Sequence, residues 1–187
     1  MIRFAEPDDC AAMLSIYEAY IETSITFELA LPSQAEFLSR METVQREYPW
    51  LVWEEDGQLL GYAYAHRFAE RAAYRVSSEL SVYLSPAARG KGLGRRLYEA
   101  LTAILQLQNV QSVYGIVTSP NERSEAMHRA LGFTRVALLP RVGYKNGWRD
   151  VSWFCKPIGA YADPPAPFRP IGSLDRAQLR AILNRFS

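Results

Sequence analysis

A glycine-rich basic segment contains the residues of this 187-residue chain that could most directly hold a charged ligand. It lies between a predicted strand and a predicted helix. Glycines let an anionic group approach the backbone, and the helix dipole favours negative charge at the same place. The segment therefore predicts a pyrophosphate-binding loop made of Arg89, Gly90, Lys91, Gly92, Leu93, Gly94 and Arg95.

Two common phosphate-binding loops do not fit this segment. A Walker A loop requires Ser or Thr after Gly-Lys, where this chain has Gly92. A dinucleotide-binding fingerprint requires a third glycine where this chain has Arg95. A glycine-rich turn before a solvated, basic helix start remains the alternative, because short glycine patterns are weak signals.

Two residues have side chains that could transfer a proton in a reaction, and Glu79 is one of them. It lies in a strand predicted over residues 76–84, on the face opposite Leu80. A carboxylate in a partly apolar pocket can take a proton from an ammonium group. The alternative is a strand carboxylate paired with a cation such as Arg75.

His128 is the second such residue, on a helix predicted over residues 122–131. An imidazole can stabilise or protonate a leaving group, or it can simply pack and cap locally. The other histidine, His66, lies near the end of a predicted strand, and the sequence assigns it no role.

Two segments at the expected separation resemble the signatures of the GNAT N-acetyltransferases. Residues 89–94 resemble that family's acyl-CoA pyrophosphate loop, and residues 80–86 are similar to the strand before it. Residues 121–133, an Asn before a helix ending in Gly-Phe, resemble the second signature. Within the family the chain most resembles the phosphinothricin and methionine sulfoximine acetyltransferases, through Glu79 and residues 127–133, 142–151 and 164–167.

The resemblance implies acetyl-CoA as the acyl donor and a set of contacts to it. The backbone of the strand at Val82, Tyr83 and Leu84 would pair with the pantetheine arm, and the loop would hold the pyrophosphate. Asn121 would hydrogen-bond the pantetheine amide region. Glu79 would be the general base, and His128 would stand where most members of the family have a tyrosine acid.

The substrate side is expected to involve Phe27, Tyr74 and Arg75. Arg75 could pair with a substrate carboxylate or phosphinate, because its guanidinium binds such groups in a bidentate manner. A solvated arginine is the alternative. No metal ligand set is recognised, since the two cysteines have neither zinc spacing nor a CxxC motif.

The function implied by the resemblance is acetyl transfer to the amino group of a small amino acid or analogue of the phosphinothricin or methionine sulfoximine/sulfone type. No cysteine lies near the signatures, so direct transfer in a ternary complex is expected instead of an acyl-enzyme. The alternatives are another amine, such as a polyamine, an aminoglycoside or a protein N-terminus, or a non-catalytic acyl-CoA sensor. Both Glu79 and His128 speak against the sensor.

The elements that must position these residues follow from hydrophobic periodicity and turn signals. The signals include a capping box that starts a helix at Ser33, an Asp-Gly hairpin turn at residues 56–57, a long helix over residues 93–107, and closing strands over residues 133–138 and 151–154 with an Asn-Gly turn at residues 146–147 between them. They predict the order β-α-α-β-β-β-α-β-α-β-β, an α/β (α+β) GNAT-like single domain with a largely antiparallel sheet flanked by helices. Residues 1–157 are expected to form this domain. Residues 158–187 are expected to form a Pro-rich extended tail and a terminal helix, capped by Ser173 and with its apolar face at Leu179, Ile182, Leu183 and Phe186.

Composition narrows the class of protein. Hydrophobic residues make up 49% and charged residues 22%, which excludes disorder for most of the chain. A net charge of +1 argues against a nucleic-acid binder and gives no support to a polycation substrate. There is no secretory signal pattern and no long apolar run, so a cytoplasmic protein without a membrane partner is expected. The resemblance implies a homodimer.

Overall fold

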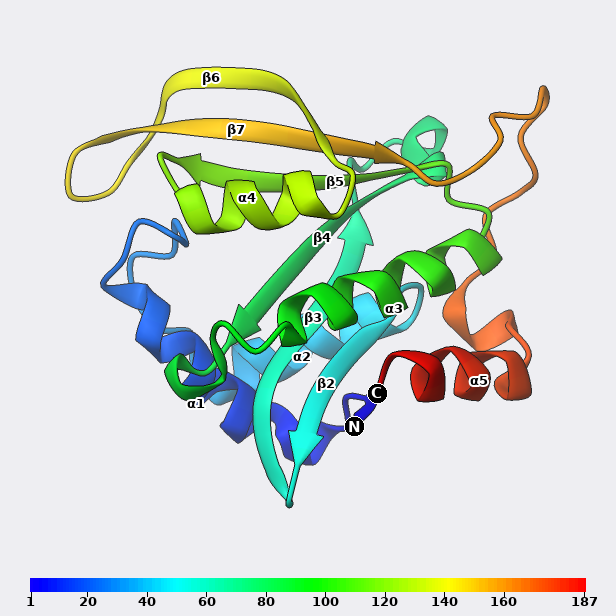
Figure 1. The fold of residues 1–187 in the computed structure, drawn as a ribbon, viewed down its shortest axis with the longest axis horizontal. Helices are drawn as coiled ribbons and strands as arrows, with labels where there is room; N and C mark the ends of the chain where they lie inside the picture. The colour runs from blue at the N-terminus through cyan, green and yellow to red at the C-terminus, as the bar shows by residue number, and fades with distance from the viewer.

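A seven-stranded sheet in the order β1-β2-β3-β4-β5-β7-β6 runs through the molecule in the computed structural model, which describes residues 1–187 (Figure 1). All neighbouring strands pair antiparallel except β4 and β5, which are parallel. The strands are β1 (Ile2–Phe4), β2 (Trp50–Glu55), β3 (Gln58–Arg67), β4 (Ser77–Leu84), β5 (Ser112–Ser119), β6 (Thr134–Tyr144) and β7 (Trp148–Pro157).

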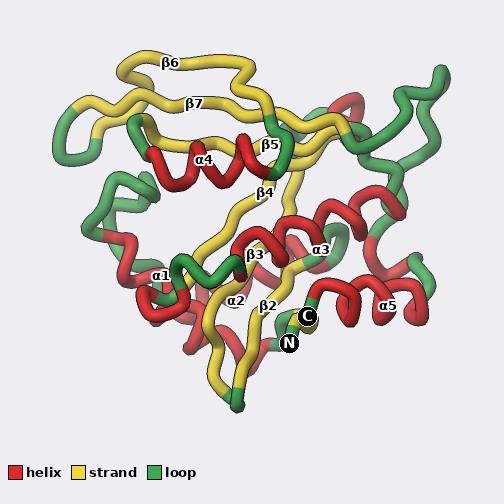
Figure 2. Tube along the Cα trace, in the orientation of Figure 1, coloured by secondary structure: helices red, strands yellow, loops and turns green.

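Five α-helices cover the two faces of this sheet (Figures 1 and 2). They are α1 (Cys10–Ile21), α2 (Gln34–Gln45), α3 (Leu93–Leu107), α4 (Glu122–Ala130) and α5 (Arg176–Phe186). Side chains of α1 and α2 pack with one face of β2 and β3, and those of α3 and α5 with the other. The predicted α/β architecture is confirmed. None of the helices has the length and apolar composition of a membrane span.

Local sequence signals explain several boundaries. Ser33 accepts a hydrogen bond from the Glu36 N–H at 3.3 Å, and the Glu36 carboxylate accepts from the Ser33 N–H at 2.9 Å. This capping box starts α2, as predicted. The β2–β3 turn has positive φ at both Asp56 and Gly57, the conformation that twists a two-residue hairpin correctly.

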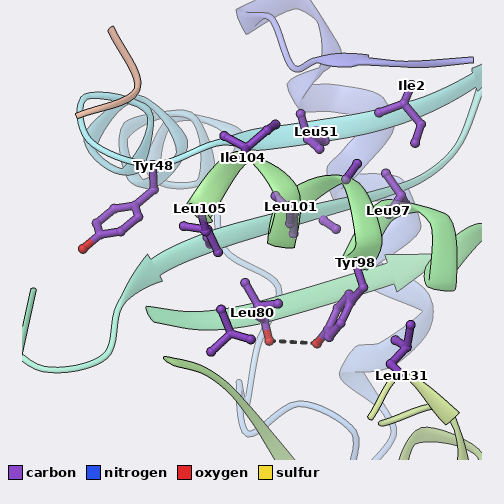
Figure 3. Close-up of a cluster of buried hydrophobic side chains, with 14 of the residues drawn as sticks. Ile2, Tyr48, Leu51, Leu80, Leu97, Tyr98, Leu101, Ile104, Leu105 and Leu131 are labelled. Carbon is purple, nitrogen blue, oxygen red and sulfur yellow. Dashed lines mark hydrogen bonds between the residues drawn. The ribbon is translucent and has the colours of Figure 1, made fainter. Parts of the chain in front are cut away.

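The central core lies between α3 and the sheet. Leu97, Leu101 and Ile104 recur at helical spacing and are fully buried, and they belong to one cluster with Leu51 and Leu80 (Figure 3). Burying a side chain of this size stabilises the fold by about 1.5–3 kcal/mol. The face of α3 that the sequence makes apolar thus holds the helix against β4, the strand that carries Glu79.

The two strands in the middle of the sheet separate along their length. β4 and β5 pair only where Ser77–Glu79 lie beside Ser112–Tyr114. β4 continues to Leu84 and β5 to Ser119 with no pairing between them (Figure 1). We call the open region between residues 80–84 and 115–119 the splay. It leaves one edge of β4 without a partner strand in the middle of the sheet.

The terminal helix α5 packs on α3 and β1, with Leu179 and Leu183 in the central core. The Ile2 N–H donates to the Ser187 hydroxyl at 2.7 Å, so the two chain ends lie together (Figure 1). The expected cap was wrong: Asp175, not Ser173, accepts the first helical N–H groups. The Ser173 hydroxyl instead donates to the Pro170 carbonyl, which closes a preceding 3-10 turn.

The final hairpin is longer than the sequence signals predicted. Expected strands at residues 133–138 and 151–154 extend in the structure to Thr134–Tyr144 and Trp148–Pro157. A bulge between Leu139 and Gly143, with Arg141 at φ 50°, lets pairing resume beyond Pro140. The turn at Asn146 and Gly147 lies where it was predicted.

Candidate active site

The main chain of β4 presents alternate residues to the splay. The Ser85 N–H donates to the Leu60 carbonyl, so the hydrogen-bonded pairs of the antiparallel β3–β4 ladder fall at residues 83, 81 and 79. The main-chain groups of Leu80, Val82 and Leu84 therefore face the splay. Tyr83 directs its N–H and C=O to β3, which leaves it no main-chain group for a pantetheine arm.

Tyrosine hydroxyls hold both ends of this free edge. Tyr98 of α3 donates to the Leu80 carbonyl at 3.0 Å (Figure 3). Tyr20 of α1 accepts from the Leu84 N–H at 3.0 Å and donates to the Leu84 carbonyl at 2.6 Å. Val82 is left between them as the strand residue best placed to pair with a ligand. A cavity of about 70 Å³ lies here, bordered by Val82, Tyr98 and His128.

The predicted phosphate loop has the backbone that its glycines favour. Gly90 and Gly92 have φ of 82° and 80°, in the left-handed region that other residues rarely adopt. Gly92 is the N-cap of α3 and supplies no side-chain cap. The N–H of Arg96 is bonded to the Gly92 carbonyl. The N–H groups of residues 93–95 precede it and are unpaired helix-start donors, the kind that bind phosphate.

Three cations belong to this loop, and a fourth lies beside it. The guanidinium of Arg89 lies 4.9 Å from the ring centre of Tyr20, and Arg95 pairs with Glu99 at 2.9 Å. Lys91 is exposed. Arg123, from the first turn of α4, lies beside Gly90, since a Cβ there would be 3.7 Å from its Nη2. The loop thus combines open N–H donors with positive charge.

Glu79 lies where β4 is still paired, just before the splay. Its side chain points to the face of the sheet that carries α1 and α2, because Leu80 points to the α3 side. Burial raises the pKa of the Glu79 carboxyl, and the nearby His66 works in the opposite direction. His66 Nε2 is 3.8 Å from Glu79 Oε1. A half-buried carboxylate with a raised pKa is suited to accept a proton.

His128 lies on the opposite face, buried between α4 and β5. Its Nδ1 is 2.8 Å from the Ser124 carbonyl, which can only accept, so the neutral ring carries its proton on Nδ1. Its Nε2 is 3.5 Å from the Tyr98 hydroxyl. Burial lowers the pKa of His128, and the hydrogen bond to Ser124 partly offsets that effect. The imidazole is therefore neutral, with Nε2 as an acceptor.

Asn121 caps α4 at the edge of the splay. Its Oδ1 accepts from the Ser124 N–H at 3.2 Å, which leaves the Nδ2 amide as the group that could donate to a pantetheine carbonyl. The residue also borders the 70 Å³ cavity. The contact of Asn121 with the pantetheine arm stays a prediction.

The three expected substrate residues are not brought together. Phe27 borders a cavity of about 740 Å³ and packs over Gly143 of β6. Arg75 is paired with Glu47 at 2.8 Å and lies over the ring of Phe168 in the tail. Tyr74 is 44% exposed. Arg75 would have to release Glu47 before it could hold a substrate anion in bidentate fashion.

Sequence reasoning missed three residues of this region. Tyr98 looks like an ordinary apolar-face residue of α3, and only the fold reveals the strand carbonyl that it reaches. Arg123 lies in the second signature but approaches the first through tertiary contact. His66 pairs with Glu79 across β3 and β4, a register that alternating strand patterns alone could have suggested.

Comparisons with known proteins agree with this geometry. A family model described as an acetyltransferase (GNAT) domain matches residues 2–153. The chain is 38% identical over 172 residues to the phosphinothricin N-acetyltransferase of Streptomyces viridochromogenes, covering 91% of this chain and 93% of that protein. It is 35% identical to the L-methionine sulfoximine/L-methionine sulfone acetyltransferase of Salmonella typhimurium, with 88% and 98% covered.

A solved structure shows the same likeness in three dimensions. The phosphinothricin acetyltransferase of Sinorhizobium meliloti, in complex with AcCoA, matches this fold with a TM-score of 0.84 and 35% identity. The match covers 90% of this chain and 93% of that one.

Proposed function

The chain belongs to the GNAT acetyltransferase family, and from this premise we propose that it moves the acetyl group of acetyl-CoA onto the amino group of a small amino acid or analogue. Substrates of the phosphinothricin and methionine sulfoximine/sulfone type are proposed because the names of the two relatives above specify them. The enzyme is an N-acetyltransferase.

The splay between β4 and β5 is the observation that carries this proposal. It offers a strand edge at Val82 for the pantetheine arm, beside the uncapped start of α3 for the pyrophosphate. Glu79 and His128 lie on opposite faces of the sheet at this opening. The thioester and the amine can therefore reach the same point from two sides, which suits direct transfer in a ternary complex.

Glu79 is proposed as the general base. An ammonium group has no lone pair, so it must lose a proton before its nitrogen can attack the thioester carbonyl. The carboxylate of Glu79 takes that proton, directly or through water. The nitrogen–carbon bond then forms, the carbon–sulfur bond breaks, and the CoA thiolate leaves. A carboxyl with a raised pKa holds the proton better than an exposed one does.

His128 is proposed to line the thioester end of the splay. The neutral tautomer with its proton on Nδ1 cannot donate from Nε2, so protonating the thiolate would need the imidazolium that burial disfavours. The proposed role is therefore to shape the site and to accept hydrogen bonds there. A modest effect of removal is expected, because a CoA thiolate is a good leaving group.

The substrate side, assembly and location complete the proposal. Phe27, Tyr74 and Arg75 are kept as candidate substrate residues, with Arg75 releasing Glu47 on binding.

A homodimer is supported by exposed apolar side chains on the β6–β7 hairpin, such as Val142 and Trp148. A cytoplasmic location is supported by the two free cysteines. We also propose a boundary after residue 157, with residues 158–187 as an appended segment.

The test is a measurement of CoA thiol release against free amino acids, methionine sulfoximine and phosphinothricin, with polyamines, aminoglycosides and N-terminal peptides as competitors. The proposal expects the highest kcat/KM for one of the small amino acids or analogues. A higher value for a polyamine, an aminoglycoside or a peptide would overturn the substrate class. Bound acetyl-CoA with no thiol release on any amine would favour the sensor.

A further inference from the structure

His66 on β3 lies directly opposite Glu79 on the neighbouring strand β4. The two residues are register partners in the antiparallel β3–β4 pair, and Nε2 of His66 is 3.8 Å from Oε1 of Glu79. Nδ1 of His66 is 2.9 Å from the Arg67 carbonyl. A carbonyl only accepts, so the neutral ring carries its proton on Nδ1. The unprotonated nitrogen of His66 is therefore the one turned toward the proposed base.

A cavity of about 600 Å³ borders His66. It is bordered by His66 and Tyr64 of β3 and by side chains of α2, whereas Glu79 is not among its lining residues. The His66 side chain is 32% exposed and that of Glu79 is 20% exposed. The more exposed imidazole thus borders an open cavity that Glu79 itself does not line.

The chemistry of the proposed function requires a proton to leave this region. An ammonium substrate loses two protons as it becomes an amide; one ends on the CoA thiol and the other must reach solvent. The Glu79 carboxyl must therefore lose the proton that it accepted before the next turnover can begin. We propose that His66 relays this proton: Nε2 accepts it from the Glu79 carboxyl, and the resulting imidazolium then loses a proton to water in the 600 Å³ cavity that its ring borders.

The charged and titratable groups around His66 decide what a protonated imidazole could interact with. On β3, Arg67 follows His66, but its guanidinium is held by Glu47 at 2.8 Å. The other titratable groups facing the pair and its cavity lie on several elements: Tyr114 on β5, Tyr62 and Tyr64 on β3, Tyr48 before β2, Tyr17 on α1, Arg40 and Arg46 on or after α2, and Glu28 and Glu70 in loops. Glu28 is paired with Arg40, and Glu47 with Arg67 and Arg75. The carboxylate that lies within 4.0 Å of a His66 nitrogen is Glu79, so the re-ionised Glu79 is the nearest partner for an imidazolium.

This inference makes His66 a positioning residue that acts through Glu79, and it rests on the proposed function. The first test is His66→Gln, which keeps a polar side chain but cannot carry a proton. We expect kcat to fall at least about tenfold in dilute buffer, within the range of proton-transfer effects, with KM for acetyl-CoA little changed. Thr43→Ala, an exposed change on the same cavity, is the matched control.

The second test separates proton transfer from packing. In His66→Ala, added imidazole should restore kcat in proportion to its concentration, and pyrazole, which has the same ring shape but is a far weaker base, should not. Equal rescue by both compounds would show a packing role and overturn the relay. Unchanged kcat in His66→Gln across the pH profile, in dilute buffer, would overturn it as well.

Failure of the relay can be distinguished from failure of the proposed function. If the wild-type enzyme acetylates no amino acid or analogue, the proposed function fails and the relay with it. If the wild-type enzyme is active, Glu79→Gln is not, and His66→Gln retains full kcat, only the relay fails. Imidazole should not rescue Glu79→Gln, because the step before the relay is then missing.

Discussion

Gly115 of β5 supplies the space that the imidazole of His128 occupies. A Cβ built on Gly115 would overlap the Nε2 and Cδ2 atoms of His128. The ring is then held on its other sides by aromatic contacts, with centroid distances of 5.2 Å to both Phe133 and Phe154. A single missing methyl group thus fixes where the histidine can lie.

Gly115→Ala should therefore destabilise the protein and displace the imidazole. Overpacking of this kind costs about 1–3 kcal/mol, which urea unfolding can measure. Gly172→Ala is the control, because no atom lies within 4 Å of its Cβ position and its φ is ordinary. In a His128→Ala background the cost of Gly115→Ala should shrink. An equal cost in both backgrounds would contradict the contact.

Burial of His128 should make stability depend on pH. Its pKa in the folded protein is lowered below the ordinary value of 6.5, so the unfolded chain binds more protons between the two values. Stability should therefore fall as the pH drops below about 6.5. His128→Phe should lose this part of the dependence, measured as the difference in unfolding free energy between about pH 7.5 and about pH 5.5. The same slope in both proteins would contradict the assignment.

Binding of the pyrophosphate by the loop can be tested with two variants that strain the backbone alike and differ only in charge. Gly92→Asp and Gly92→Asn both force a side chain onto a residue with φ of 80°, and only the first adds negative charge. Acetyl-CoA affinity should be weaker in the Asp variant by at least tenfold, about 1.4 kcal/mol, when compared with Asn by calorimetry. Equal acetyl-CoA affinity in the two folded variants would show that the pyrophosphate does not bind at this loop.

The terminal helix should contribute to stability although it follows a Pro-rich connector. Leu183 is buried in the same cluster as α3, so Leu183→Ala should cost about 2–5 kcal/mol. Arg180→Ala, on the exposed side of α5, is the control and should lie within about 0.5 kcal/mol of wild type. Thermal unfolding compares the two. A Leu183→Ala protein as stable as wild type would make α5 dispensable.

Short-range signals in the sequence predicted the elements well. The capping box at Ser33, the Asp56–Gly57 turn and the apolar face of α3 each act within a few residues, so their outcome does not depend on the rest of the fold. The cap of α5 shows the limit of such signals. Ser173 and Asp175 are both competent caps; Ser173 ends a 3-10 turn and donates to the Pro170 carbonyl, and Asp175 caps the helix.

The candidate site was only partly predictable, because its geometry comes from contacts distant in sequence. The loop residues were found, since glycine φ and helix-start donors are local properties. The splay depends on where β4 and β5 stop pairing, which no local pattern encodes. The partner of Arg75 is likewise a glutamate 28 residues away.

The most direct test of the account is kcat/KM of Glu79→Gln across about pH 6 to 10, beside wild type and His128→Phe. The variant keeps the size of the side chain but cannot take the amine's proton. We expect a fall of about 10²–10⁴, with acetyl-CoA binding preserved, and a fall of only about tenfold for His128→Phe. In the wild-type enzyme kcat/KM should rise with pH as Glu79 loses its proton, with a midpoint above the ordinary glutamate pKa of 4.5. Near wild-type rates in Glu79→Gln, with an inactive His128→Phe, would contradict the account and make His128 the base.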